Sequence, residues 1–284
     1  MNDKRILLDH LNKIHTTESG VARIKKNLNL NSAGMVAFCK KKISATDCFV
    51  YKQGKNYYCL IDNIRFTINA NSYTIITAHK TSMDKAVIYI HGQGGNAEEA
   101  NHYKHLFKDG DVIGFDYKAQ TPWEAKEEFP LFFDLMRNKF ESVILIANSI
   151  GAYFSMHALA GRKIAKAFLI SPVADMEKLI LSMMEQAGVT EEELREKKEI
   201  PTASGAVLSW KYLSYVKAHP IEWSIPTEIL YGEKDLITSF EIISGFAHRT
   251  GAGLTVMKGG EHWFHTEEQM AFADMWLRKC LTKK

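Results

Sequence analysis

A serine in a strand-to-helix context is the first feature of the sequence that could do chemistry. Ser149 lies in the run Ala147-Asn148-Ser149-Ile150-Gly151, between an apolar expected strand and an expected helix. A serine on such a sharp turn projects its hydroxyl above the edge of a sheet, and small residues two positions away on either side let strand and helix approach closely. Gly151 meets this requirement, and Ala147 replaces glycine at the cost of one methyl group. The sequence predicts that Ser149 is a nucleophile.

A histidine and an aspartate follow the last two expected strands. A serine hydroxyl attacks only when a base removes its proton. His262 follows the last expected strand and Asp235 follows the strand before it. The chain order serine, acid, histidine is the one that goes with this type of turn. We expect Asp235 to orient His262 and His262 to activate Ser149, with His265 and Glu233 as the alternative base and acid.

A glycine-bearing loop could stabilise the negative oxygen of a tetrahedral intermediate. The loop His91-Gly92-Gln93-Gly94-Gly95 follows an apolar strand. We expect the backbone N–H groups of Gln93 and Ile150 to form the oxyanion hole. The Ile150 N–H also begins a helix, whose positive end favours an anion. Phosphate binding is the alternative for this loop, although the loop lacks the lysine of a P-loop and the spacing of a dinucleotide fingerprint.

These residues need a sheet edge to hold them together, and the second part of the chain predicts one. Apolar segments typical of buried strands alternate with segments of helical spacing. The expected strands are 86–90, 112–115, 143–147, 165–170, 228–231 and 254–257, and the expected helices are 96–108, 123–139, 150–160 and 266–280. Such alternation predicts an α/β fold with a mostly parallel sheet and helices on both faces.

Residues 173–225 separate two of the expected strands and are expected to form a small helical cap. They carry an apolar stripe that includes Met183, followed by aromatic residues that include Trp210. One interpretation is that these side chains pack the cap onto the body of the domain. The other is that they line an acyl pocket, because such pockets are mainly apolar and aromatic. Met183, Trp210 and Trp263 are the candidate pocket residues.

Residues 1–80 differ from the remainder in pattern and in charge. Helical spacing over 3–30 and 32–43 is followed by short segments typical of strands at 56–61, 64–69 and 73–77, so a small α+β unit is expected. Residues 1–80 hold thirteen Lys/Arg and five Asp/Glu, whereas residues 81–284 hold 23 and 28. This split predicts two domains, 1–80 and 81–284. The basic residues are interpreted as solvated lysines or as a surface for nucleic acid or another anionic partner.

The bulk composition favours a cytoplasmic globular protein. Hydrophobic residues make up 46% and charged residues 24% of the 284 residues. No stretch of eighteen apolar residues is present, so no membrane span is expected. The four cysteines have spacings that match no zinc pattern and are expected to be reduced thiols.

The motifs HGQGG, ANSIGA, YGEKD and GGEHWF occur in an order that resembles the α/β-hydrolase superfamily over about 85–280. They most resemble the branch of serine esterases, lysophospholipases and acylaminoacyl peptidases. The resemblance implies an α/β-hydrolase fold and a serine hydrolase that cleaves an ester or related acyl bond of a small molecule through an acyl-serine intermediate. It implies no metal and no organic cofactor.

Three alternatives to an esterase stay open: a peptidase or a thioesterase with the same residues, and a non-enzymatic binding or signalling protein. Residues 1–80 resemble a small uncharacterised bacterial domain, on the runs HTTESGVARIKKNLNL and NSYTIITAHK. Their strands are expected to supply the antiparallel edge strands that usually open an α/β-hydrolase sheet.

Overall fold

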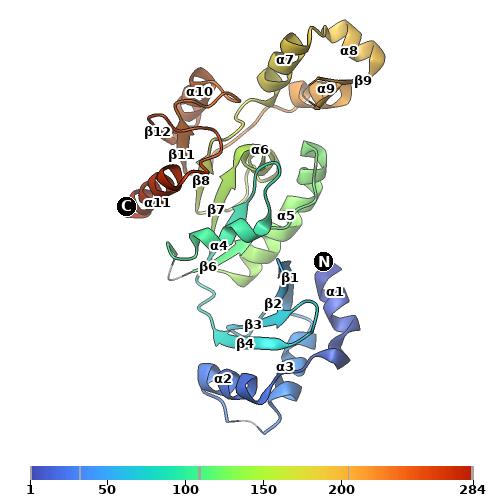
Figure 1. Cartoon of the computed structure of the whole chain (residues 1–284), viewed down its shortest axis with the longest axis vertical. Helices are drawn as coiled ribbons and strands as arrows, with labels where there is room; N and C mark the ends of the chain where they lie inside the picture. The colour runs from blue at the N-terminus through green and yellow to red at the C-terminus, as the bar shows by residue number, and fades with distance from the viewer. Residues whose placement is uncertain (1, 32, 108–109, 204, 283–284) are drawn as a thin grey trace. The chain divides into compact units, whose positions relative to one another are not determined.

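The computed structural model describes residues 2–31, 33–107, 110–203 and 205–282, and it divides into two compact units (Figure 1). The first unit contains the chain up to Ile88, together with Asn96–Asp116 and Leu135–Ser142. The second unit contains Tyr89–Gly95, Tyr117–Asp134 and the chain from Val143 onward.

The first unit opens with helices and continues as an antiparallel sheet. The helices are α1 (Asn2–Asp9), η1 (Leu11–Lys13), α2 (Glu18–Leu28) and α3 (Met35–Ser44). The strands are β1 (Phe49–Gln53), β2 (Asn56–Ile61), β3 (Ile64–Asn69) and β4 (Ile75–Lys80), paired in chain order. The hydroxyl of Thr17 accepts a hydrogen bond from the Gly20 N–H and caps α2, as a threonine at this position favours. Strand β1 was not predicted, and Ser32, in the third expected helix, lies outside the described residues.

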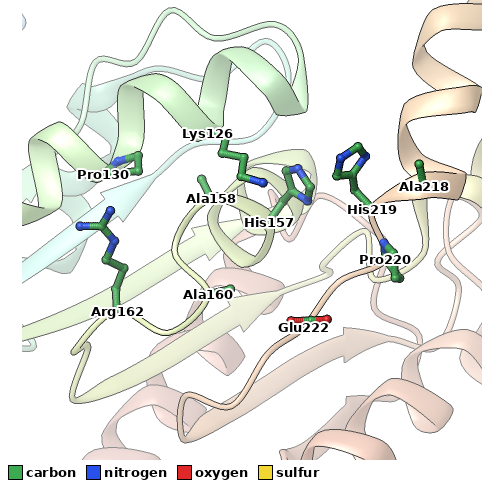
Figure 2. A pocket seen from close by; sticks show the side chains of 10 residues that line it. All are labelled: Lys126, Pro130, His157, Ala158, Ala160, Arg162, Ala218, His219, Pro220 and Glu222. Atoms are coloured by element: carbon green, nitrogen blue, oxygen red, sulfur yellow. The ribbon is translucent and has the colours of Figure 1, made fainter.

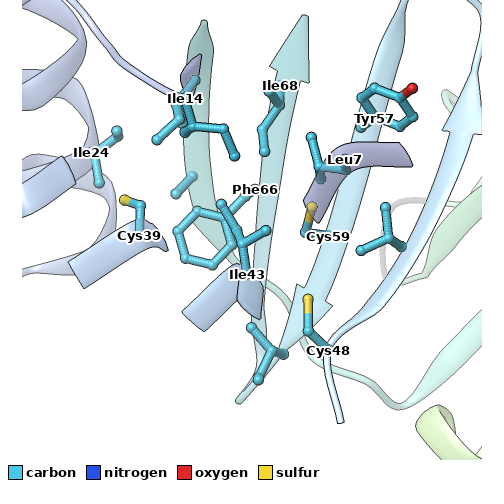
Figure 3. Close-up of a cluster of buried hydrophobic side chains, with 14 of the residues drawn as sticks. Leu7, Ile14, Ile24, Cys39, Ile43, Cys48, Tyr57, Cys59, Phe66 and Ile68 are labelled. Carbon is cyan, nitrogen blue, oxygen red and sulfur yellow. The ribbon is translucent and has the colours of Figure 1, made fainter. Parts of the chain in front are cut away.

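Apolar side chains from these helices and from one face of the sheet form the core of the first unit. Leu7, Ile24, Cys39 and Phe66 are fully buried there and come from α1, α2, α3 and β3 (Figure 3). All four cysteines of the chain are buried free thiols. The period-two alternation of β2 and β3 therefore gives the sheet one apolar face, which the helices cover.

The other face of this sheet contacts residues 96–116 of the same unit. The Gln53 side-chain amide donates to the carbonyl oxygen of Ala97 at 3.2 Å. Arg65 forms an ion pair with Asp111, whose carboxylate also accepts from the Thr81 hydroxyl at 2.8 Å. The expectation that the N-terminal strands extend the hydrolase sheet was wrong for the described residues, because the four strands form a separate sheet.

The second sheet has six strands in the order β12-β11-β8-β7-β5-β6. The neighbours from β12 to β7 pair in parallel. The strands are β5 (Lys85–Ile90), β6 (Asp111–Gly114), β7 (Ser142–Asn148), β8 (Lys166–Ile170), β11 (Thr227–Gly232) and β12 (Gly253–Met257). All six expected strands are present, with ends within two residues of the predicted ones.

The helices that accompany this sheet agree less uniformly with prediction. They are η2 (Ala97–Glu99), α4 (Ala100–Tyr103), α5 (Pro122–Lys139), α6 (Ser149–Ala158), α10 (Phe240–Thr250) and α11 (Glu267–Thr282). The single helix expected over 96–108 was wrong: η2 and the four-residue α4 replace it, and residue 108 lies outside the described residues. Helix α10 was not predicted. No described helix is long and apolar enough to cross a membrane.

The segment between β8 and β11 contains α7 (Met176–Ala187), α8 (Glu191–Lys197), β9 (Glu199–Pro201), β10 (Val207–Ser209) and α9 (Trp210–Ala218). These helices contact one another and form one group (Figure 1). The ribbon of β9 and β10 is an addition to the helical cap that the sequence predicted. On α5, Trp123 packs edge-on against Tyr212 and Tyr215 of α9, with ring centroids 5.7 and 5.2 Å apart.

Candidate active site

Ser149 occupies the turn between β7 and α6 in a strained backbone conformation. Its φ angle is +48°, in the left-handed region that residues with a side chain rarely adopt. Strand β7 ends at Asn148 and α6 begins at Ser149, so no linker relieves the turn. Strain of this kind persists only where the surrounding structure holds it, and it is common at functional sites.

Close packing explains the small residues around this turn. A Cβ atom at Gly151 would lie 2.2 Å from the carbonyl oxygen of His91 and 2.9 Å from Cγ2 of Ile90. Position 151 therefore requires glycine. Ala147 is fully buried within β7, where its methyl group is accommodated.

A continuous hydrogen-bonded chain joins the three predicted catalytic residues. The Ser149 hydroxyl lies 2.7 Å from Nε2 of His262, and Nδ1 of His262 lies 2.7 Å from Oδ2 of Asp235. Both the His262 and Asp235 side chains are almost fully buried. With Nδ1–H donating to the carboxylate, Nε2 is free to accept the proton of the serine hydroxyl.

Asp235 is itself held in place by the backbone. Its Oδ1 accepts from the N–H groups of Ile237 and Thr238 at 2.8 and 3.0 Å. The loops after β11 and β12 pack against each other, since a Cβ at Gly232 would lie 2.6 Å from the carbonyl oxygen of Gly260. This packing brings the acid and the histidine together from two neighbouring strands.

The alternative acid and base lie elsewhere. The Glu233 carboxylate accepts from the Gly259 N–H at 2.8 Å and is exposed. His265 is exposed and its Nδ1 lies 3.7 Å from the Glu261 carboxylate. Neither residue joins the hydrogen-bonded chain that contains Ser149.

The predicted oxyanion donors lie on the two segments that flank the serine hydroxyl. Ile150 is the second residue of α6, so its N–H has no acceptor within the helix. The Gln93 N–H has no hydrogen-bond partner among the described residues. The loop that carries it passes close to the serine, because a Cβ at Gly92 would lie 3.2 Å from the Ser149 Cβ.

Tyr117 supports this loop and was not predicted. Its hydroxyl donates to the carbonyl oxygen of His91 at 2.9 Å, and the two rings stack at 4.3 Å. The same carbonyl oxygen faces Gly151. Tyr117 lies three residues beyond the end of β6, and a buried tyrosine hydroxyl usually finds a partner. The position of Tyr117 just past the end of an expected strand was the sequence signal that could have placed it near the site.

The three candidate pocket residues are exposed or partly exposed. Trp263 is 72% exposed, and Met183 and Trp210 are partly exposed. None of the three lines the cavity beside His157 or the cavity beside Arg65. Beside Asp235, Leu236 is 97% exposed, so apolar side chains stand in the open next to both His262 and Asp235.

The arrangement is suited to nucleophilic chemistry. Among the described residues, no group of three or more His, Cys, Asp or Glu side chains could hold a metal ion. The serine hydroxyl, a buried imidazole and a buried carboxylate can instead move a proton from the hydroxyl to the imidazole as a new bond forms.

Comparisons with known proteins agree with the fold. The structure is similar to Est1E from Butyrivibrio proteoclasticus, at a TM-score of 0.59 and 14% identity, over 80% of this chain and 98% of that one. It is similar to Est1E with ferulic acid bound, at 0.60 and 13%, over 82% and 97%. It is also similar to alpha/beta hydrolase domain-containing protein 10 from mouse, at 0.57 and 17%, over 82% and 98%.

Two further comparisons concern the sequence. Residues 8–79 match a family described as a protein of unknown function, DUF3781. A comparison with curated proteins finds no match. The six-stranded sheet, the strained serine turn and the structural likenesses together show that this chain has the α/β-hydrolase fold.

Proposed function

We propose that the protein is a serine hydrolase that cleaves an ester or related acyl bond. The observation that carries the proposal is the chain of two 2.7 Å hydrogen bonds from Ser149 through His262 to Asp235. In this mechanism the Ser149 Oγ attacks the acyl carbon while its proton passes to Nε2 of His262. The alcohol then leaves with that proton, and a water molecule activated by His262 releases the acid from the acyl-serine.

The negative oxygen of each tetrahedral intermediate is held by the N–H groups of Gln93 and Ile150. The free Ile150 N–H at the start of α6 supports this role, because helix N-termini favour negative charge. Removing one donor of such a pair costs about two to three orders of magnitude in rate in other enzymes. The apolar exposed side chains of Leu236 and Trp263 provide a surface for the acyl portion of the substrate.

Hydrolysis across an acyl chain-length series of chromogenic esters tests the proposal. We expect turnover by the wild type and none above background by Ser149→Ala. The absence of turnover with every ester, followed by turnover of thioesters or small peptides, would move the proposal to those acyl bonds. Equal activity of the wild type and Ser149→Ala on all of them would refute it.

A further inference from the structure

A cavity of about 530 Å³ lies at the end of α6 that is remote from Ser149. It is lined by residues of α5, of the end of α6 and the chain after it, and of the end of α9 and the chain after it (Figure 2): Lys126, Pro130, His157, Ala158, Ala160, Arg162, Ala218, His219, Pro220 and Glu222. This volume is in the range of small-ligand sites. Eight residues of helix, about 12 Å, separate Ser149 from His157, so the cavity is not part of the site described above.

Three basic side chains gather on one side of this cavity. Lys126, His157 and His219 lie near one another, while Glu222 lies apart from them (Figure 2). The rings of His157 and His219 are 6.3 Å apart. Among the residues that the structure describes, no carboxylate pairs with any of the three. Arg162 differs, because its guanidinium forms an ion pair with Asp134.

Tyr215 of α9 fixes both imidazoles. Its hydroxyl lies 3.0 Å from Nε2 of His157, and its carbonyl oxygen accepts from Nδ1 of His219 at 2.8 Å. The His219 ring also stacks on the Tyr215 ring at 4.1 Å. With its Nδ1 committed to this carbonyl oxygen, His219 keeps Nε2 for a ligand.

The clustered basic side chains favour the binding of a negatively charged group. Burial, followed by the charges of Lys126 and His219, lowers the pKa of His157 from 6.5 to about 4. Lys126 and His219 thus disfavour a positive charge on His157. A bound anion relieves this repulsion and makes charge-assisted hydrogen bonds with the same groups.

We propose that this cavity is a second ligand site, for a small molecule that carries a carboxylate or phosphate group bound by Lys126, His157 and His219. Glu222, on the other side, accepts a hydroxyl or ammonium donor from the remainder of the ligand. The site stands independently of the hydrolase function. It joins α5 and α6 to the segment that follows α9, so occupation ties the cap helix to the body of the unit.

Calorimetric titration of the full chain with sodium phosphate, sodium acetate and sodium sulfate tests this site. We expect wild-type protein to bind at least one of these anions. Lys126→Gln and His219→Gln should each weaken binding by roughly tenfold, the loss expected for one charge-assisted contact. Lys178→Gln is the matched control, because Lys178 is also an exposed helical lysine and lies outside the cavity. A preference for phosphate over acetate identifies a phosphorylated ligand, and the reverse identifies a carboxylate.

The pH dependence with sulfate provides a second readout, because sulfate keeps its charge. The charged and titratable groups that line the cavity are Lys126, Arg162, Glu222 and the two histidines, and the Tyr215 hydroxyl contacts His157. An anion favours protonated His157, whose pKa is lowered to about 4, so affinity should rise as the pH falls from about 6 toward about 4. The rise should be absent in His157→Gln. Equal binding by wild type, Lys126→Gln and Lys178→Gln, or no binding of any of the three anions by folded wild type, would overturn the proposal.

Discussion

In the proposed mechanism Asp235 acts through the imidazole of His262 rather than on a substrate, and this determines what its replacement should do. Asparagine keeps the acceptor for the Ile237 and Thr238 N–H groups but cannot stabilise a charged His262. We expect Asp235→Asn to fold normally and to lower kcat for ester hydrolysis by about four orders of magnitude. Glu233→Gln, as the control, should retain wild-type kcat. A loss of kcat in Glu233→Gln and none in Asp235→Asn would show that Glu233, and not Asp235, is the acid.

The tight turn at Ser149 permits a paired test of its two small neighbours. Gly151→Ala places a methyl group 2.2 Å from the His91 carbonyl oxygen, so either the loop or α6 must move. We expect this variant to lose most activity and to be less stable by about 2 kcal/mol. Ala147→Gly removes one buried methyl group and should cost about 1 kcal/mol without loss of kcat. Thermal melting and ester turnover of the two variants distinguish these results, and equal behaviour would contradict the packing argument.

At the scale of elements, the loop that follows β5 depends on Tyr117 beyond β6. Tyr117→Phe keeps the ring stack on His91 and removes the hydrogen bond to its carbonyl oxygen. In the proposed mechanism, the loss of that bond would let the Gln93 N–H move away from the oxyanion. We expect kcat to fall by roughly tenfold with little change in KM, since the bond acts on the transition state. A rise in KM at constant kcat would instead indicate a role in substrate binding.

The burial of His157 on α6 makes the stability of the fold depend on pH. The pKa of His157 is lowered from 6.5 to about 4 in the folded chain, so the unfolded chain binds a proton first as pH falls. This contribution to stability is complete above pH 6.5 and is lost between pH 6.5 and about 4, at up to about 1.4 kcal/mol per pH unit. Thermal midpoints of wild type and His157→Gln measured over this window test it. Parallel curves for the two proteins would contradict the assignment.

Prediction from sequence succeeded where the signal is local. Short runs of residues were enough to predict the buried apolar strands and the turn at Ser149. Because Asp235 and His262 each follow the end of a strand, the sequence also predicted that these two side chains would meet. Helix α10 was missed although its sequence carries a signal: Ser239 can cap the helix, and Ile243, Phe246 and Ala247 have helical spacing. Strands β9 and β10, three residues each, carry no such signal and depend on pairing with each other. The Tyr117 contact likewise depends on an approach between distant segments.

At the scale of the whole molecule, the N-terminal 80 residues and β6 belong to the same compact unit, in which Arg65 of β3 pairs with Asp111 of β6. Arg65→Ala would leave the buried Asp111 carboxylate with the Thr81 hydroxyl as its side-chain partner among the described residues, and it should destabilise the protein by about 2 kcal/mol. Lys42→Ala breaks the exposed pair with Asp62 and should change stability by less than about 0.5 kcal/mol. Urea unfolding midpoints measure both. Equal changes in the two midpoints would mean that the buried ion pair contributes no more to stability than the exposed one.

The structural matches also extend into the first 80 residues. Residues 81–284 make up about 72% of the chain, whereas the matches to Est1E and to the mouse protein cover 80% to 82%. Each match therefore includes part of the segment before residue 81. The separate family match over residues 8–79 shows that this segment also has relatives of its own.

Covalent trapping of Ser149 is the most direct test of the proposed hydrolase. A fluorophosphonate reacts with a serine that an adjacent histidine activates, and the phosphonylated peptide can be identified by mass spectrometry. We predict one adduct on wild-type protein, located at Ser149, and none on Ser149→Ala. Failure of the folded wild type to react, or an adduct that persists in Ser149→Ala, would contradict the account.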